Sequence, residues 1–492
     1  MEKIHVAVDI GGSSVKITAS RFSGGTIEHL KEQTLPNNPL RLQGSLYIDI
    51  YYLYGAIKSA LKEYLNLGFE PVSFGIDTYG NGYGVFNADA QMIGLPFFYK
   101  DARTQGILPL LEERLALREL YERTGVYPTD IRVLMQLFHE VRTGRQRMRQ
   151  ADRILLFPDL LAHFFTGKTQ TERSMASVAS LLGPDGDWCR CTMRQLGIDA
   201  GLFGPLIDGG QNGVKRLLPS VCGELGTEDI RYVDVTTHDT ESALLAAPML
   251  DEEAVFASLG TSVILGARTP GPVISDEAYE GRFKNMRGAF GQNSLCRDYT
   301  GLWILEQCMA SWRQEAPGLT YDDILSDCNA ATENDSFFDV NHTAIRFYKG
   351  SLIDAIQIYC RDTGQRAPRT RGETALCVLE SIALEAKWSF EKLKALVKNR
   401  FSRISAVGGG VKNALLLQML ADALGLPLLA GSPFAATAGN VLMQLYALGD
   451  IKTVQGIAEV ARNSCDGIKI EPRGRGDKWE RALARLEQYK ME

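Results

Sequence analysis

Short apolar runs that end at glycines recur along the chain and predict buried strands. The run from Ile4 to Ile10 stops at Gly11-Gly12, and a second run follows at once from Val15 to Phe22. A matching strand, turn and strand are predicted over 254–266, with Gly260-Thr261-Ser262 at the turn. The segments AVDIGGSSVKITA (7–19) and ASLGTSVILGA (257–267) share this plan. They indicate either a duplicated domain or a chance similarity between two short segments.

Helical patterns separate these strands. Apolar residues at positions 53, 57, 61 and 65 predict a helix over 53–66, and helical spacing dominates from about 106 to 165. Further helices are expected over 241–247, 375–396 and 412–424 and from about 435, with strands over 72–76, 404–407 and 426–430. This mixture predicts an α/β fold. A proline and an acidic run near 245–253 suggest a boundary there, which gives domains 1–247 and 248–492.

Composition narrows the class of protein. The 492 residues carry a net charge of -6, which argues against nucleic acid as the main partner. The nine cysteines are scattered without a CxxC pair, as expected for reduced thiols in a cytoplasmic protein. The start MEKIHVAVDIGG does not resemble a signal peptide, and no long apolar run predicts a membrane span. We therefore expect a small-molecule partner; the sequence does not predict the oligomeric state.

A nucleotide-binding P-loop is suggested only superficially. Gly167-Lys168-Thr169 matches half of that motif, but Ala162 stands where its first glycine is required. The three residues also end the helical pattern 160–165, whereas a P-loop precedes a helix. We therefore reject a P-loop and predict that Gly167 terminates the helix.

The two glycine turns offer another way to bind phosphates. Glycine lets the backbone approach an anion, and Ser13, Ser14 and Thr261 add hydroxyl donors while Lys16 adds a cation. Asp9, at the end of the first strand, could hold a hydrated Mg²⁺. The same residues also fit two ordinary β-turns. Gly408-Gly409-Gly410, between a strand and a helix, fits either a flat ligand lying on the backbone or a tight turn.

Asp239 is the candidate catalytic base. A carboxylate that accepts the proton of an attacking hydroxyl is needed for phosphoryl transfer to an alcohol. Asp239 lies at a predicted strand-to-helix junction, where it could equally cap the helix. Other polar residues that could line a sugar pocket are Asp49, Asp101, Arg103 and Asp298. Asp101 and Arg103 could instead form a surface ion pair.

Taken in order, these segments resemble the FGGY carbohydrate kinases of the actin/hexokinase-like ATPase superfamily, and within them the rhamnulokinases. The resemblance runs from Val6 to about Gly439. It rests on VAVDIGGSS (6–14), SFGIDTYG (73–80), GLPFFYKDART (94–104), FPDLLAHFFTGK (157–168), THDTESAL (237–244), SLGTS (258–262), TGLWIL (300–305) and VGGGVKN (407–413).

The resemblance implies two ribonuclease-H-like α/β domains with an interdomain cleft, and it implies ATP and Mg²⁺ as cofactors. It assigns Asp239 as the catalytic base and Asp9 as the residue that holds Mg²⁺ through water. The implied ATP-binding residues are Gly12, Ser13, Ser14, Val15, Lys16, Thr261, Glu306, Gly409, Gly410 and Asn413. The implied sugar contacts are Gly80, His238, Asp239, Thr240 and Asp298.

Several positions depart from the rhamnulokinase pattern. Tyr79-Gly80-Asn81-Gly82 replaces a segment with Trp and Asp, and Ile48-Asp49 replaces a Trp-Asp pair. Asp298 and Glu306 replace an Asn and a Gln, and Val15 replaces a Gly. We expect ATP-dependent phosphorylation of a primary hydroxyl of a small ketose such as L-rhamnulose. The alternatives are a fuculokinase or xylulokinase type of activity, or a sugar-responsive regulator that binds ATP without catalysis.

Overall fold

The computed structural model describes residues 2–211, 213–331, 334–346, 348, 350–465, 467–474 and 476–490. The chain forms two compact units. The first consists of Met1–Ala246, Thr269–Leu295 and Phe434–Cys465, and the second of Ala247–Arg268, Cys296–Pro433 and Asp466–Glu492. Two segments beyond position 247 therefore belong to the first unit.

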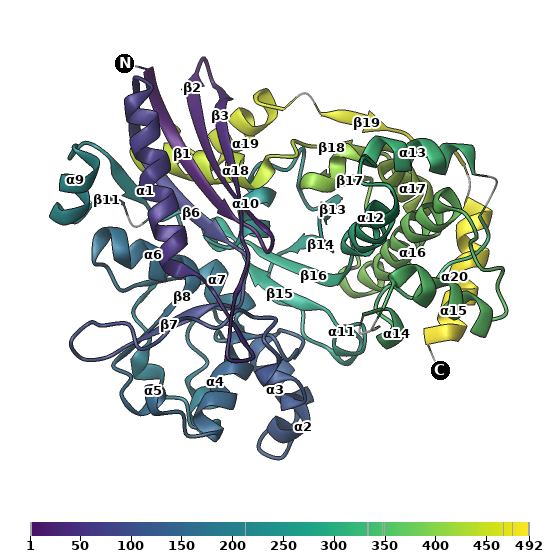
Figure 1. Cartoon of the computed structure of the whole chain (residues 1–492), viewed down its shortest axis with the longest axis horizontal. Coiled ribbons are helices and arrows are strands. Elements are labelled where there is room, and N and C mark those ends of the chain that lie inside the picture. The colour runs from purple at the N-terminus through teal and green to yellow at the C-terminus, as the bar shows by residue number, and fades with distance from the viewer. Residues whose placement is uncertain are drawn as a thin grey trace. The chain divides into compact units, whose positions relative to one another are not determined.

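The first unit is built on a six-stranded sheet with the order β11-β12-β6-β1-β2-β3. The strands β1 (Glu2–Ile10), β2 (Ser14–Ser23) and β3 (Thr26–Pro36) form an antiparallel meander (Figure 1). On the other side, β6 (Phe69–Thr78) runs parallel to β1, and β12 (Arg231–Val233) runs parallel to β6. The edge strand β11 (Val214–Arg216) is antiparallel to β12. Because β1, β6 and β12 point the same way, their carboxyl ends lie along one edge of the sheet.

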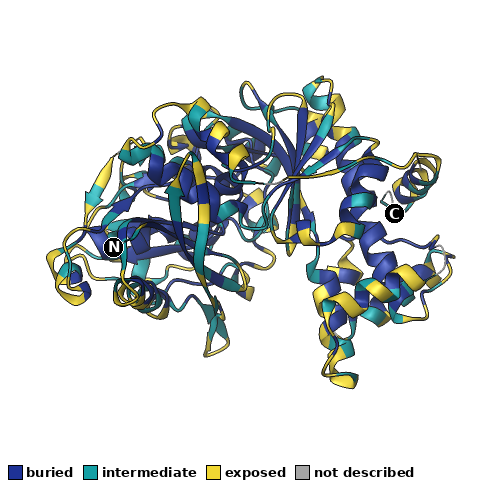
Figure 2. Cartoon of the chain, turned by 90° about the horizontal axis from the view of Figure 1, so that it is seen from above, coloured by how far each residue is buried: buried dark blue, intermediate teal, exposed yellow. Residues whose placement is uncertain are grey.

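Burial on both faces of β1 explains its continuous apolar run. Ile4, Val6, Val8 and Ile10, which share one face of β1, are fully buried, and on the other face Ala7 is fully buried and His5 is 6% exposed. Much of each sheet has the colour of buried residues in Figure 2, as in a sheet covered by helices on both sides. Helices α1 (Ile50–Asn66) and α6 (Phe157–Thr166) share one core with β1 and β6. Helix α18 (Ala435–Leu448) also packs against β1 and β6.

Helix α10 (Asp239–Leu245) is held very close to α18. A Cβ atom added at Gly439 of α18 would lie 1.8 Å from the Ser242 carbonyl oxygen of α10. The Ser242 hydroxyl donates a hydrogen bond of 2.9 Å to the Ala436 carbonyl oxygen. The absence of a side chain at position 439 therefore allows α10, which carries Asp239, to lie this close to α18.

The second unit repeats this strand order. Within a seven-stranded sheet it contributes β16-β14-β13-β17-β18-β19, the counterpart of β3-β2-β1-β6-β12-β11. Here β13 (Ala254–Leu259) pairs antiparallel with β14 (Ser262–Thr269) and parallel with β17 (Arg403–Val407). Next come β18 (Leu428–Ala430), parallel to β17, and β19 (Ile468–Ile470), antiparallel to β18. The repeated order favours the duplicated domain over a chance similarity.

The remaining elements complete the two units. In the first unit they are β4 (Leu40–Leu42), β5 (Ser45–Tyr47), β7 (Tyr83–Phe86), α2 (Ile107–Glu112), α3 (Leu117–Thr124), α4 (Val133–Arg142), α5 (Gln146–Arg149), β8 (Arg153–Leu156), β9 (Thr171–Glu172), α7 (Arg173–Val178), α8 (Arg190–Gln195), β10 (Leu206–Ile207), α9 (Pro219–Leu225), α11 (Asp276–Glu280), β15 (Lys284–Arg287) and α19 (Val454–Asn463). The others are β16 (Asn293–Thr300), α12 (Trp303–Glu315), α13 (Tyr321–Ala330), α14 (Thr343–Arg346), α15 (Leu352–Asp362), α16 (Arg371–Val397), α17 (Ala414–Leu424) and α20 (Gly476–Lys490). Within the described ranges, none of the helices has the length and apolarity needed to cross a membrane.

Candidate active site

Three carboxylates gather where β1, β6 and β12 end. Asp9 of β1 and Asp77 of β6 are direct neighbours in the parallel register. The chain leaving β12 stays beside β6, because Thr78 N donates a hydrogen bond of 2.8 Å to the Thr237 carbonyl oxygen. Asp239 follows two residues later. Adjacent parallel strands therefore bring together three residues that are far apart in the sequence.

Asp239 is the first residue of α10, whose N-cap is His238. The structure therefore corrects the expected helix start at Glu241 and the idea that Asp239 is the cap. Asp239 Oδ1 accepts hydrogen bonds from Thr240 N (2.6 Å) and Thr240 Oγ1 (3.2 Å), and its side chain is 30% exposed. Burial, and next the nearby Asp9 charge, raise the Asp239 pKa to about 7, although Thr240 and Lys284 oppose this shift. A carboxylate with this pKa can accept a proton near neutral pH.

Asp9 lies opposite Lys16 across the first hairpin. The two residues are partners in the antiparallel register of β1 and β2, so their side chains share one face of the sheet. Burial raises the Asp9 pKa to about 6, while the Lys16 ammonium group lowers it and Glu32 raises it. A half-buried carboxylate with other carboxylates nearby is a hard oxygen ligand of the kind that suits Mg²⁺. Among the described residues, however, His, Cys, Asp and Glu form no cluster of three that could hold a metal by themselves.

The first hairpin turn is braced from one side and open at its tip. Gly11 N donates to the Ser14 carbonyl oxygen, and Asn37 donates from its amide side chain to the Gly11 carbonyl oxygen. Gly12 and Ser13 at the tip are exposed. The Val15 side chain is buried in the core, which leaves only its backbone for contact with a ligand. This geometry suits an anion that binds exposed backbone N–H groups.

The predicted sugar-side residues of the first unit cluster beside Asp239. A Cβ atom at Gly80 would lie 4.0 Å from the His238 ring, and His238 Nε2 is 3.6 Å from Asp239 Oδ1. Tyr99, which the sequence analysis did not assign, joins them, since a Cβ atom at Gly12 would lie 3.4 Å from its hydroxyl group. Burial, and next the Asp239 charge, raise the Tyr99 pKa to about 12.

Other polar candidates have structural partners. The Asp49 side chain accepts a hydrogen bond from Tyr52 N and caps α1. Asp101 and Arg103 form a buried ion pair of 3.5 Å, with side chains 3% and 5% exposed, so the alternative of a surface ion pair is wrong. Gly167 ends α6 in the left-handed conformation, which confirms that the Gly-Lys-Thr segment is not a P-loop.

Asp77 is a buried carboxylate that the sequence analysis did not assign. Its Oδ2 accepts a hydrogen bond of 2.6 Å from Asn440 Nδ2 of α18, and its Oδ1 has no hydrogen-bond partner among the described residues. Burial, and next the Asp9 charge, raise the Asp77 pKa well above its usual range. This carboxyl group therefore binds its proton more tightly in the folded chain than in the unfolded chain.

Replacing Asp77 with Asn should stabilise the protein at alkaline pH. Because the folded-state pKa of Asp77 is raised, Asp77 destabilises the fold progressively as pH rises above the unfolded value of about 4. Asp77→Asn should raise the free energy of unfolding by about 1–3 kcal/mol at pH 8 and by less at pH 5, as thermal melts would measure. Glu385→Gln is the control with the opposite sign, because Arg297 and Lys490 lower the Glu385 pKa despite its burial. An equal effect of Asp77→Asn at both pH values would contradict the assignment.

In the second unit, the other glycine hairpin is bonded to the start of α12. Gly301 N donates to the Thr261 carbonyl oxygen (3.0 Å), and Leu302 N donates to the Gly260 carbonyl oxygen (3.0 Å). Glu306 follows in the first turn of α12 and is exposed. Asp298, on β16, is exposed as well. The hairpin thus brings Thr261 and the first turn of α12 together.

The three glycines at positions 408–410 are not all explained by packing. Gly408 has φ 89°, and a Cβ atom there would lie 2.6 Å from the Leu259 carbonyl oxygen, while one at Gly410 would lie 2.7 Å from Leu259 Cβ. These two glycines are explained by a tight turn against β13. A Cβ atom at Gly409 would meet no atom of the described structure within 4 Å, so packing does not explain this glycine.

Asn413 connects this turn to a tyrosine that the sequence analysis missed. Its Oδ1 caps α17 by accepting from Leu416 N (2.9 Å), and its Nδ2 donates to the Tyr321 hydroxyl (2.8 Å). Burial raises the Tyr321 pKa, the Asn413 hydrogen bond lowers it, and Glu306 is close enough to raise it electrostatically. Glu306, Tyr321 and Asn413 therefore form one polar group within the second unit.

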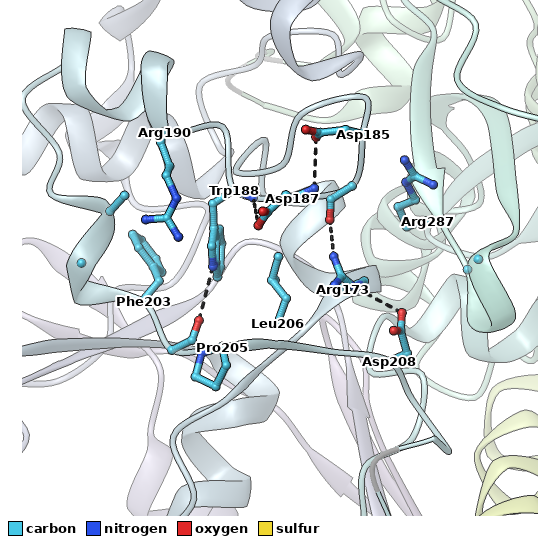
Figure 3. A pocket seen from close by; sticks show the side chains of 16 residues that line it. Arg173, Asp185, Asp187, Trp188, Arg190, Phe203, Pro205, Leu206, Asp208 and Arg287 are labelled. Carbon is cyan, nitrogen blue, oxygen red and sulfur yellow. Dashed lines mark hydrogen bonds and ion pairs between the residues drawn. The ribbon is translucent and has the colours of Figure 1, made fainter.

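A separate pocket of about 710 Å³ lies in the first unit (Figure 3). Arg173 donates to the Gly186 carbonyl oxygen and pairs with Asp208 at 3.3 Å. Arg287 donates to the Pro184 carbonyl oxygen. These contacts give both guanidinium groups a structural role in the loops around the pocket.

Comparisons with known proteins identify the family of the chain and agree with its fold. Residues 4–246 match the N-terminal domain, and residues 255–448 the C-terminal domain, of the FGGY family of carbohydrate kinases. The chain is 30% identical to a rhamnulokinase of Bacteroides thetaiotaomicron over 465 residues (94% of this chain, 95% of the relative). It is 31% identical to one of Klebsiella pneumoniae over 472 residues (93% and 92%).

Solved structures of low sequence identity share the whole fold. A ligand-bound xylulose kinase from Lactobacillus acidophilus superimposes with a TM-score of 0.79 at 14% identity, covering 99% of this chain and 97% of that one. Plasmodium falciparum glycerol kinase with ADP gives a TM-score of 0.79 at 12% identity, covering 100% and 98%. The expected two-domain α/β fold of the actin/hexokinase-like type is thereby confirmed.

Proposed function

Because the chain belongs to the FGGY family of carbohydrate kinases, we propose that it transfers the γ-phosphate of ATP to a primary hydroxyl group of a small ketose. The mechanism rests on the Asp239 carboxyl group, which is half-buried, lies near Asp9 and has a pKa of about 7. Such a group is ionised often enough at neutral pH to act as a base, and basic enough to take a proton from an attacking alcohol.

In this mechanism the sugar hydroxyl binds against Asp239 and loses its proton to the carboxylate. Its oxygen bonds to the γ-phosphorus of ATP as the bond from that phosphorus to the β-phosphate oxygen breaks and ADP leaves. Thr240 fixes Asp239 Oδ1 with two hydrogen bonds, which leaves Oδ2 for the sugar. Gly80 and His238 pack beside the carboxylate and shape the place where the sugar lies. The orientation of one hydroxyl group toward a fixed base supplies much of the rate enhancement.

The first hairpin is the proposed phosphate-binding element of the first unit, and Thr261 is a proposed phosphate contact in the second unit. Exposed N–H groups at Gly12 and Ser13 and the Lys16 ammonium group offset phosphate charge. Ser14 adds a hydroxyl donor, and Val15 contributes its backbone. Asp9 would hold Mg²⁺ through water, and the cation would neutralise charge on the β- and γ-phosphates.

The adenosine part of ATP is assigned to the second unit. Gly409 leaves open space above the backbone, and Gly410 and Asn413 follow it in the same turn. Glu306 and Tyr321 extend this polar group and would supply acceptors for the ribose hydroxyls or the adenine amine.

The first candidate substrate is L-rhamnulose, because the curated relatives that cover 93–94% of this chain are rhamnulokinases. Asp298 and the segment Tyr79-Gly80-Asn81-Gly82 depart from the rhamnulokinase pattern, which keeps related ketoses as alternatives. Asn81 adopts a left-handed conformation with φ 77°, and its carbonyl oxygen accepts a hydrogen bond from Gln136. This hydrogen bond ties the segment to Gln136 of α4.

A substrate panel tests the proposal. ADP release would be measured with L-rhamnulose, L-fuculose, D-xylulose, L-ribulose and glycerol, each at fixed ATP and Mg²⁺. We expect kcat/KM for one ketose to exceed that for glycerol by at least about 100-fold, since a site built to bind several hydroxyl groups rejects analogues that lack them. Nucleotide binding without ADP release on any sugar would instead support the non-catalytic regulator.

A further inference from the structure

Glu172 is a buried carboxylate directly before α7, and a single oxygen atom of it gathers many donors. Its Oε2 accepts hydrogen bonds from Ser174 N (3.0 Å), Met175 N (3.4 Å) and the Ser174 hydroxyl. The same oxygen accepts from Thr237 N (3.1 Å) and Thr237 Oγ1 (2.8 Å). Glu172 is 2% exposed, so these donors replace water around its charge.

We propose that Glu172 is a positioning residue that fixes the catalytic base Asp239 through residues 237 and 238. This inference rests on the proposed function, in which Asp239 takes the proton. Both backbone N–H groups that precede Asp239 are involved: Thr237 N donates to Glu172, and His238 N donates to Ser174 Oγ (3.1 Å). The Ser174 hydroxyl in turn donates to Glu172, so one carboxylate holds both peptide units.

The opposite side of the same segment is bonded to the sheet. The Thr237 carbonyl oxygen accepts from Thr78 N at the end of β6. Residue 237 is therefore held between β6 on one side and the start of α7 on the other. With the segment fixed from both sides, the first residue of α10 has little freedom to shift, and the Asp239 carboxylate keeps its orientation.

The length and the carboxylate group of the Glu172 side chain suit the positioning of residues 237 and 238 better than they suit the capping of α7 alone. A short helix such as α7, of six residues, needs only a small side chain as its cap. The longer glutamate reaches past α7 to Thr237, which is 65 positions away in the sequence. An ionised acceptor also binds N–H and O–H donors more strongly than an amide oxygen does. Burial raises the Glu172 pKa above its usual value, and the hydrogen bonds from Ser174 and Thr237 oppose this rise without cancelling it.

Glu140 provides a matched control. It is as deeply buried as Glu172, but its partners are the Tyr83 hydroxyl (2.8 Å) and the Arg147 guanidinium group, to which it is bonded by both oxygens. Glu140→Gln removes a buried charge, as Glu172→Gln does, at a place bonded to α5 and β7 instead of residues 237 and 238.

The experiment compares Glu172→Gln with Glu140→Gln by steady-state kinetics and by ADP binding. Glu172→Gln should lower kcat about 10- to 100-fold, the effect of a small misplacement of a catalytic group, while the KM for ATP and the Kd for ADP stay within about twofold. Glu140→Gln should lower the melting temperature and leave kcat within about twofold. A kcat loss that is equal in the two variants, or no loss in Glu172→Gln, would overturn the inference.

A double variant separates positioning from general damage. If Glu172 acts through Asp239, adding Glu172→Gln to Asp239→Asn should not reduce the residual rate further, because residues that act as a unit are not additive. A further 10-fold loss would overturn the inference. Should Glu172→Gln fold poorly, Thr237→Val removes only the 2.8 Å hydroxyl donor and should show the same non-additive behaviour. An Asp239→Asn variant with wild-type turnover would reject the proposed function itself, whatever Glu172→Gln does.

Discussion

Replacing Asp239 with Asn is expected to lower kcat by about 10²–10⁴-fold, the range for loss of a general base. The amide has nearly the same shape and can still accept the hydrogen bonds from Thr240, so α10 should keep its start. What the variant loses is the ability to take the proton of the sugar hydroxyl. Coupled ADP release measures kcat, and calorimetry with ADP should give a Kd within about threefold of the wild type.

The control for this variant is Asp199→Asn. The Asp199 side chain accepts a hydrogen bond from Gly201 N in a short turn of the first unit, a role that Asn fills equally well. Its kcat should therefore equal that of the wild type. If Asp239→Asn also kept wild-type turnover, another residue would have to accept the proton.

Replacing Gly439 with Ala should have the largest effect on stability. A new Cβ atom would lie 1.8 Å from the Ser242 carbonyl oxygen, a backbone atom that cannot move aside without displacing α10 from α18. We expect a loss of about 3 kcal/mol or more in the free energy of unfolding, measured in urea, because overpacking against backbone is not relieved by side-chain rotation. The remaining folded protein should also have a lowered kcat, since α10 carries Asp239 at its first position.

Gly55→Ala in α1 is the matched control. It makes the same change inside a helix, but a Cβ atom there meets no described atom within 4 Å. The substitution should therefore stabilise the protein by about 0.5–1 kcal/mol, the helix preference of Ala over Gly. A destabilisation in Gly55→Ala as large as that in Gly439→Ala would show that the contact with Ser242 is not the cause.

Local signals in the sequence predicted the strands and turns that frame the site. Gly11-Gly12 ends the buried β1, and Gly260 ends β13, because a long apolar run must stop where the chain reverses. The helix predicted over 53–66 is α1, which begins at Ile50 because Asp49 caps it. Strand ends, turns and helix caps are determined by residues close to one another in the sequence. A local sequence pattern can therefore predict them.

The rest of the site depends on tertiary neighbours. Asp77 acquires its raised pKa only because β6 lies beside β1, which places Asp77 next to Asp9, and because the fold buries it. Its hydrogen-bond partner Asn440, on α18, is 363 positions away in the sequence. Tyr321 matters only through Asn413, which is 92 positions away. Likewise, Glu172 looks like an ordinary surface residue in the sequence, and the fold alone buries it against Thr237. Contacts between distant segments leave no periodic signal.

The pH dependence of kcat/KM for the best ketose tests most directly whether the Asp239 carboxylate takes the proton. This profile reports the free enzyme, in which burial and Asp9 raise the Asp239 pKa to about 7. A raised carboxylate pKa keeps the base protonated at low pH, so kcat/KM should rise tenfold per pH unit below about pH 7 and level off above it. A profile that is flat between pH 5 and pH 8 would contradict Asp239 as the base.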